Sequence, residues 1–113
     1  EYPEQNTPHV SLIAYCRDTY VRPHRHPAGK PETYQMIEGE LDVIFFDDRG
    51  NINRRIEMGT PDTGKPFIYR LSGELWHRPV PITEFVFFCE TFKGPFVKEK
   101  DVEYAKWADP ERY

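Results

Sequence analysis

No hydrophobic run in this sequence is long enough to cross a membrane: no uninterrupted apolar stretch exceeds five residues, whereas a membrane-spanning helix needs about 20. No signal-peptide pattern is visible near the N-terminus. Basic residues are not clustered either, because no run of Lys and Arg exceeds two residues and the formal net charge is −4. A nucleic-acid-binding surface normally requires a basic patch. We therefore expect a cytoplasmic protein with no membrane or nucleic-acid partner.

Cysteine is scarce, with Cys16 and Cys89 as the only two in the chain. They form no Cys-x-x-Cys motif, which argues against the usual zinc-thiolate and redox signatures. A disulfide is possible in principle, but two cysteines in a chain expected in the cytoplasm are more often reduced. We expect both to be free thiols, buried on strands.

The chain is short, and its 113 residues are expected to form one domain, residues 1–113. A chain of this length can bury a hydrophobic core without disulfides to hold it. Aromatic residues are frequent, with 8 Phe and 7 Tyr, and many stand in runs typical of strands. Together with 11 Pro, this composition favours an all-β fold over a helical bundle.

Strand-like segments recur at intervals of roughly 8–12 residues, separated by turns that contain Gly or Pro, a pattern typical of a β-sandwich or barrel. We expect residues 1–9 to form an N-terminal arm and residues 97–113 a tail with one helical turn at residues 101–106. The strands are expected at residues 10–16, 20–26, 32–37, 41–46, 52–58, 66–71, 75–79 and 83–92.

The stretch that carries chemistry contains His24 and His26, followed by Glu32 and Gly39. On a strand, residues two apart face the same side at roughly 6.6 Å. Two imidazoles in this arrangement can share one metal ion, because metal–nitrogen bonds are about 2.0–2.1 Å long. A further imidazole, His77, stands much later in the chain. The His-x-His pair alone is a weak signal, since a short chain with so few His shows one by chance about one time in ten.

The spacing of these residues resembles the first signature motif of the cupin superfamily, in which His-x-His is followed by Glu and then Gly. Five residues separate His26 from Glu32, where the family usually has three or four, and six separate Glu32 from Gly39. The second cupin motif is represented by Gly73 and His77, with Leu in place of the usual Pro and three residues between Gly and His instead of two. The Asn that usually follows is missing.

A narrower resemblance covers residues 20–113. Several segments are similar to the WbuC family of cupin-fold metalloproteins, whose members occur in bacterial O-antigen and surface-polysaccharide clusters; they are residues 20–27, 45–50, 76–77, 88–96 and 106–108. The chain departs from the family at its front, where members usually carry a longer segment. The resemblance implies an all-β, single-domain cupin, a double-stranded β-helix or jelly-roll barrel with a pocket at one end. It also implies that the metal ligands are His24, His26, Glu32 and His77.

Three further residues are candidates for contact with a substrate. Arg22 stands two residues before His24 and would hold a phosphate or carboxylate, or else form a structural ion pair with Glu32 or Glu90. Tyr34 is expected on the same side of its strand as Glu32, where it offers a phenol for catalysis or substrate binding, or only caps the site. Glu90 matches a Glu in the WbuC family and would be a catalytic base in the pocket or the partner of a ligand His.

Trp76 is a candidate substrate-binding residue, although core packing is the more common role of a large aromatic side chain. The same core role is expected for the aromatic residues Phe45, Phe85, Phe87 and Phe88. His9 lies outside the motif, and we expect it to be a solvated residue of the arm.

The resemblance implies an enzyme or a binding protein. As an enzyme, the chain would use a divalent metal, one of Fe, Mn, Ni, Cu or Zn, as a Lewis acid in isomerisation or epimerisation of a small anionic sugar or nucleotide-sugar. Fe(II)-dependent dioxygenase chemistry is the rival reaction. As a binding protein, it would capture such a molecule without turnover, and a purely structural metal is the third interpretation. We also expect a homodimer paired through an edge strand, as is common among single-domain cupins.

Overall fold

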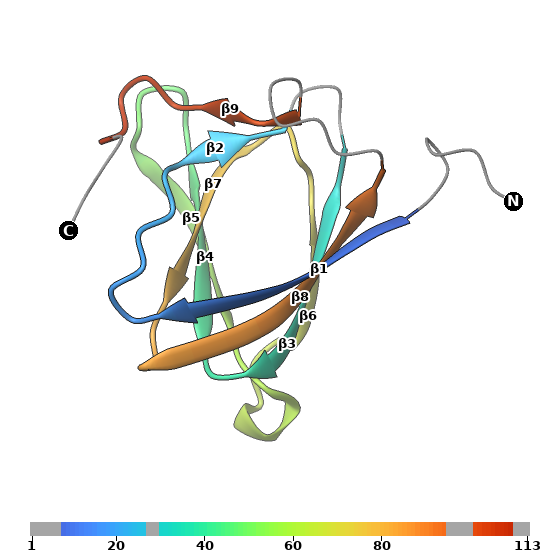
Figure 1. The fold of residues 1–113 in the computed structure, drawn as a ribbon. Coiled ribbons are helices and arrows are strands. Elements are labelled where there is room, and N and C mark those ends of the chain that lie inside the picture. Colours follow the sequence, from blue (N-terminus) through green and yellow to red (C-terminus); the bar gives the residue numbers. More distant parts are fainter. Residues whose placement is uncertain (1–7, 27–29, 95–100, 110–113) are drawn as a thin grey trace, which may run out of the picture.

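Two antiparallel β-sheets face each other in this computed structural model, which describes residues 8–26, 30–94 and 101–109 (Figure 1). The four-stranded sheet has, in spatial order, β1 (Pro8–Cys16), β8 (Phe85–Lys93), β3 (Glu32–Glu38) and β6 (Ile68–Leu71). The five-stranded sheet has β5 (Ile52–Met58), β4 (Leu41–Phe46), β7 (Trp76–Pro81), β2 (His24–Arg25) and β9 (Glu103–Tyr104). A single 3-10 turn, Pro61–Thr63, interrupts the strands in these ranges, and no helix there is long and apolar enough to cross a membrane. The predicted all-β fold is confirmed.

The core lies between the two sheets and follows the two-residue period of the strands. In β3, Glu32, Tyr34 and Met36 are all buried, which confirms the prediction that they share one side. All but the last residue of β4 is buried. The main cluster consists of Tyr34, Met36, Leu41, Val43, Phe45, Met58, Leu71, Val86 and Phe88.

The second predicted strand, residues 20–26, is much shorter in the structure, where β2 comprises His24–Arg25 alone. Pro23 explains the difference, because proline has no N–H to contribute to a strand ladder. The predicted helical turn at residues 101–106 is also wrong, since Glu103 and Tyr104 pair with Arg25 and His24 to form β9. In Figure 1 this short strand lies beside β2 at the top of the molecule.

The N-terminal arm begins to pair earlier than predicted. Pro8 and His9 already belong to β1, and the His9 ring stacks on Phe92 with 4.6 Å between centroids, so His9 is not the solvated residue we expected. Residues 1–7 and the tail residues 97–100 and 110–113 lie outside the described ranges.

Both cysteines are free, as predicted, but the prediction that they are buried is wrong. Cys16 is exposed and Cys89 is half-buried, because both point outward from the four-stranded sheet. Phe85 and Phe87 share this outward direction, whereas Val86 and Phe88 point into the core. The core role predicted for the aromatic residues therefore holds for Phe45 and Phe88 and fails for Phe85.

Candidate metal centre

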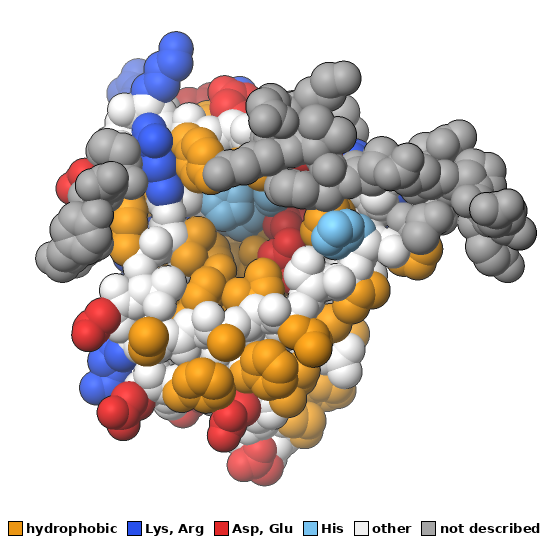
Figure 2. Space-filling model, in the orientation of Figure 1, with side chains coloured by type: hydrophobic (Ala, Val, Ile, Leu, Met, Phe, Trp, Pro, Cys, Tyr) orange, Lys and Arg blue, Asp and Glu red, His pale blue; other side chains and the backbone are white. Residues whose placement is uncertain are grey.

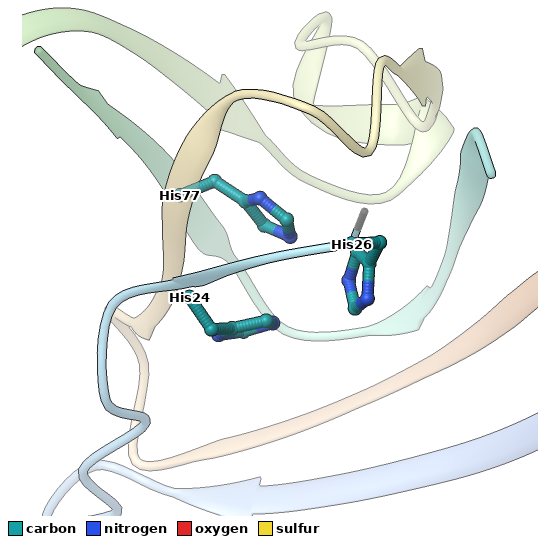
Figure 3. A group of neighbouring side chains, drawn as sticks. All are labelled: His24, His26 and His77. Carbon is teal, nitrogen blue, oxygen red and sulfur yellow. The ribbon is translucent and has the colours of Figure 1, made fainter. Parts of the chain in front are cut away.

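Three imidazoles meet at one end of the space between the sheets, where they come from two neighbouring strands (Figure 3). His24 of β2 and His77 of β7 are register partners, and directly opposed residues of antiparallel strands point to the same side. His26 follows two residues after His24 and returns to that side. One ring nitrogen from each of the three lies within 4.8 Å of the others. Figure 2 shows histidine and acidic side chains at the bottom of a hollow in the surface.

The backbone fixes the protonation pattern of all three rings. In each ring Nδ1 lies beside a backbone carbonyl oxygen, which can only accept a hydrogen bond, so Nδ1 carries the proton. The Nε2 atom of each neutral ring is then an unprotonated lone pair, which is the form that binds metals. The acceptors are the carbonyl oxygens of Arg22 for His24, Asp101 for His26 and Leu75 for His77, at 2.8, 2.7 and 2.8 Å.

Glu32 closes the cluster from the opposite sheet. Its Oε2 lies 3.0 Å from Nε2 of His26 and 3.1 Å from Nε2 of His77. Nε2 of His26 is buried and, despite the short distance, is not aligned to form a hydrogen bond with any described residue. The Nε2 lone pair of His26 and the carboxylate oxygen of Glu32 are close enough to bind the same cation. Three imidazole nitrogens and one carboxylate oxygen suit Fe, Mn, Ni, Cu or Zn.

Gly73, which precedes His77 in the second predicted motif, allows the close backbone packing that positions His26. A Cβ on Gly73 would collide with the backbone carbonyl oxygen of Lys30 and would lie 3.0 Å from Cβ of His26. The backbone oxygen of Gly73 also accepts a hydrogen bond from the N–H of His26. Only glycine therefore lets the turn before His77 approach the backbone that carries His26 this closely.

The pKa values of the cluster reflect burial opposed by one negative charge. Burial, followed by the neighbouring His77, lowers the pKa of His24 to about 3. Burial also lowers the pKa of His26, but the Glu32 carboxylate outweighs burial and raises it above 6.5. For Glu32, burial acts to raise the pKa, but the adjacent rings of His26 and His77 outweigh it and hold the pKa far below 4.5. Without a metal, the charge of the ionised Glu32 therefore favours the protonated form of His26.

Metal affinity is expected to fall with decreasing pH, beginning above pH 6.5. A proton and a metal compete for Nε2 of His26, and the raised pKa of this ring favours the proton earlier than in a free imidazole. We expect the apparent dissociation constant to rise by about tenfold for each pH unit below the pKa of His26. A competition titration with a chromophoric chelator between about pH 8 and pH 5.5 measures this dependence. A constant affinity over that range would contradict imidazole ligation.

Glu90 lies beside Glu32, and two carboxyl groups so close do not both ionise easily. Burial, the charge of Glu32 and a hydrogen bond to Glu32 together raise the pKa of Glu90 to about 8. At neutral pH Glu90 of the metal-free protein is therefore protonated, and its O–H donates a hydrogen bond to Glu32. The structure places Glu90 on the cavity wall, where we predicted either a base or a partner of the ligands.

Comparison with solved structures identifies the fold. The chain superimposes on a protein from Shewanella oneidensis with a TM-score of 0.73 and 10% identity, covering 91% of this chain and 65% of that one. It superimposes on Lactobacillus farciminis oxalate decarboxylase with a TM-score of 0.67 and 17% identity, covering 88% and 27%. It superimposes on dTDP-4-dehydrorhamnose 3,5-epimerase from Elizabethkingia anophelis with a TM-score of 0.63 and 13% identity. The match covers 82% of this chain and 53% of that one. The chain has a cupin fold. It spans less than two thirds of each of these three proteins.

Sequence comparisons are less informative. A family model described as "Domain of unknown function (DUF6016)" matches residues 3–58, and no curated protein matches the chain. The predicted cupin fold is thus confirmed, whereas the narrower resemblance to the WbuC family stays a prediction.

A cavity of about 620 Å³ opens over His24, His26 and Glu32, and Arg22 lies on its wall. The Arg22 guanidinium lies over the Tyr104 ring, 5.1 Å from its centroid, and Nη2 donates to the carbonyl oxygen of Ala105 at 3.1 Å. Within the described ranges Arg22 forms no ion pair, and its buried Nε has no hydrogen-bond partner. The predicted alternative of an ion pair with Glu32 or Glu90 is therefore wrong. The free Nε–H is a donor available to an anionic ligand.

Two predicted substrate-contacting residues lie away from the cavity. Tyr34 is 1% exposed and packs against Phe88 in the core. Trp76 is the strand neighbour of His77 and therefore points to the opposite side of β7, where its Nε1 donates to Asp48 at 3.1 Å. Neither is among the described residues that line the cavity. The roles predicted for them in catalysis and substrate binding are corrected accordingly.

Three tyrosines that line the cavity, Tyr15, Tyr20 and Tyr104, were missed from the sequence. Tyr15 points inward from β1, and burial, followed by the charges of Glu90 and Glu32, raises its pKa well above 10. The alternation of β1 could have revealed it, because Ile13 and Tyr15 occupy the inward positions. Tyr104 reaches the cavity from β9, which the sequence did not predict.

The C-terminal strap, residues 101–109, holds one side of the centre in place. Its Asp101 carbonyl orients His26, and its Ala105 N–H donates to the carbonyl oxygen of Pro23 at 3.0 Å. Trp107 anchors the strap by packing against Phe46, at 5.2 Å between ring centroids, and against Trp76, at 6.1 Å. The strap is thus a structural support for a metal ligand.

Replacing Trp107 by Ala is expected to weaken metal binding by about tenfold, although Trp107 touches none of the ligands. The loss of its packing loosens the strap, and the Asp101 carbonyl then orients His26 less well. Metal titration followed by a chelator measures the effect. Lys106→Ala is the matched control, because Lys106 is an exposed neighbour in the same strap. Equal affinities for W107A and wild type would show that the strap has no part in the centre.

Proposed function

We propose that this chain is a metal-binding cupin that takes a small anionic sugar or nucleotide-sugar into the cavity lined by His24, His26 and Glu32. The proposal is carried by three imidazole nitrogens that lie within 4.8 Å of one another, with the Glu32 carboxylate 3.0 Å from Nε2 of His26 and 3.1 Å from Nε2 of His77. Such a cluster is electrostatically unfavourable without a cation and favourable with one. The WbuC resemblance suggests surface-polysaccharide biosynthesis in the cytoplasm as the biological setting.

Arg22 is proposed to bind the anionic group of the ligand. Its Nε–H is buried without a partner among the described residues, and its side chain is fixed by Ala105 and Tyr104. A pre-positioned guanidinium binds a phosphate or carboxylate without the entropic cost of ordering a long side chain. Tyr15 and Tyr104 add aromatic surface and phenol groups suited to a sugar ring.

Isomerisation or epimerisation is the reaction that these groups suit best. A divalent metal, when bound, supplies Lewis acidity to a carbonyl or vicinal diol oxygen. Glu90 has a pKa of about 8 in the metal-free protein and lies on the cavity wall, so it can hold or accept a proton near neutral pH. Tyr15 stays protonated at the same pH and can donate a hydrogen bond. Sugar-epimerase and ketoisomerase structures among the cupin neighbours agree with this choice.

The experiment is a conversion assay with protein loaded anaerobically with Mn, Fe, Ni, Cu or Zn. A panel of nucleotide-sugars and small hydroxy acids is followed by NMR, with oxygen uptake recorded in parallel. Stereochemical conversion that requires metal, and that falls at least tenfold in R22A but not in the exposed control R54A, supports the proposal. Oxygen uptake would establish a dioxygenase instead. Metal-dependent binding without conversion would establish a binding protein, and no binding would overturn the proposal.

A further inference from the structure

Behind the metal centre, the same strands carry a second row of side chains on their outer side. Trp76 precedes His77 on β7 and Arg25 follows His24 on β2, so alternation turns Trp76 and Arg25 away from the imidazoles. The register that opposes His24 to His77 brings Arg25 opposite Trp76, and its guanidinium lies over the indole ring, 4.3 Å from the centroid. Two functional groups of opposite character are thus stacked directly behind the ligands.

This outer row extends onto the strand at each side. Phe46 of β4 is the register partner of Trp76, and its ring packs against Trp107 of the strap. Glu103 of β9 is the register partner of Arg25, and its carboxylate accepts two hydrogen bonds from the guanidinium, at 3.1 and 3.3 Å. Each side chain of the row is therefore held by a neighbour before any ligand arrives.

A groove of about 360 Å³ lies over the outer row, bordered by the strap and by the turn after β4. Small-molecule sites in proteins have volumes of about 300–1,000 Å³, so the groove is large enough to be one. Tyr104 is the single described residue that lines both this groove and the cavity at the metal centre. The side chains that matter for binding are Trp76, Trp107, Arg25, Glu103, Asp48 and Lys106.

Three polar groups in the groove have unused hydrogen-bonding capacity. Asp48 accepts a hydrogen bond from Nε1 of Trp76 through Oδ1, and its Oδ2 has no partner among the described residues. Arg25 uses Nε and Nη2 on Glu103, so within the same part of the chain Nη1 is free. Lys106 is exposed and forms no ion pair with any residue that the structure describes. Two donors and one acceptor therefore stand beside two indole rings.

We propose that this groove binds a neutral sugar ring, as a ligand site separate from the metal-bearing cavity. The charges of Arg25 and Lys106 balance those of Asp48 and Glu103, so the groove favours neither an anion nor a cation. A hydroxyl group both donates and accepts hydrogen bonds, so neighbouring sugar hydroxyls satisfy the donors and the acceptor together. The C–H face of the ring packs on the indole rings. The proposal does not depend on the reaction proposed for the metal cavity.

Anchoring of the strap does not account for all of these groups. The packing of Trp107 and the ion pair between Arg25 and Glu103 hold the strap whether or not the groove is filled. Oδ2 of Asp48 and Nζ of Lys106 take part in neither contact, yet both side chains line the groove. Changing these two groups therefore tests ligand binding without loosening the strap.

Tryptophan fluorescence reports on the groove selectively, because Trp76 and Trp107 are the only tryptophans in the chain. We expect titration with D-glucose, D-galactose or D-mannose to give a saturable change for at least one sugar, with a dissociation constant of about 1–10 mM. Asp48→Asn keeps the acceptor for Trp76 but replaces the free oxygen by an amide N–H₂, and it should weaken binding at least fivefold. Lys106→Ala should weaken it about threefold. Asp62→Asn is the matched control, because Asp62 is an exposed acid in the 3-10 turn, outside the groove.

Two further comparisons test the location of the site and the charge of its ligand. R22A should bind the sugar as wild type does, because Arg22 lines the inner cavity and not the groove. The uronate of the same sugar should bind no more tightly than the neutral form. The proposal is overturned if none of the three sugars gives a saturable change, or if D48N binds as well as wild type. It is also overturned if R22A abolishes binding, or if the uronate binds tenfold more tightly.

Discussion

His77→Ala is expected to lower metal affinity by at least about 100-fold while leaving the β signal in circular dichroism largely unchanged. His77 is fully buried, contacts Glu32 at 3.1 Å and supplies one of three converging nitrogens. Without it, the remaining imidazoles hold the ion through fewer bonds, and Glu32 loses one of its two imidazole neighbours. The metal-free variant is also expected to be less stable by about 1–3 kcal/mol, because the change leaves a small cavity and a less satisfied carboxylate.

His9→Ala is the matched control for this experiment. His9 stacks on Phe92 in the same sheet as Glu32 but is not one of the three clustered imidazoles. Isothermal titration or competition with a chelator compares the two variants, and chemical denaturation compares their stabilities. Equal losses of metal in H9A and H77A would show that the ligand set is wrong.

Glu32→Gln has the second large effect, because it removes one charge while keeping the size of the side chain. Metal affinity should fall by about 10- to 100-fold, since a neutral amide is a weaker ligand than a carboxylate. In the metal-free protein the pKa of Glu90 should fall from about 8 toward its ordinary value, because the charge of Glu32 and the hydrogen bond to it both raise that pKa after burial. The pKa of His26 should fall as well, since the Glu32 carboxylate is what raises it.

NMR titration of the Glu90 carboxyl and the His26 ring in metal-free protein measures both shifts. Glu57→Gln is the control, because Glu57 is an exposed acid on β5. If the pKa of Glu90 stays near 8 in E32Q, burial alone sets it and the coupling between the two carboxyl groups is absent.

Local sequence patterns predicted most of the fold and part of the candidate metal centre. Alternation placed Glu32, Tyr34 and Met36 on one buried side, and the spacing of His24, His26 and the later His77 indicated a shared ion. These features depend on residues close in sequence or on a motif whose spacing is itself the signal. Gly73 could also be recognised, because its motif position reflects a backbone approach that any side chain would block.

Long-range contacts could not be predicted from the chain. The C-terminal segment pairs with β2 through Tyr104 and supplies the Asp101 carbonyl that orients His26, a contact 75 residues away in the sequence. Nothing in the local sequence distinguishes this strand from a helical turn. Tyr34 was misplaced for a related reason, because alternation gives the side of a strand but not how far the cavity extends along it. Trp76 is different, because alternation itself places it on the opposite side of β7 from its neighbour His77.

Anomalous diffraction from crystals soaked in a divalent transition metal tests the central claim most directly. We predict one peak per chain, about 2.0–2.2 Å from Nε2 of His24, His26 and His77 and within bonding distance of a Glu32 oxygen. A peak located elsewhere, or no peak among the three imidazoles at saturating metal and pH 8, would contradict it.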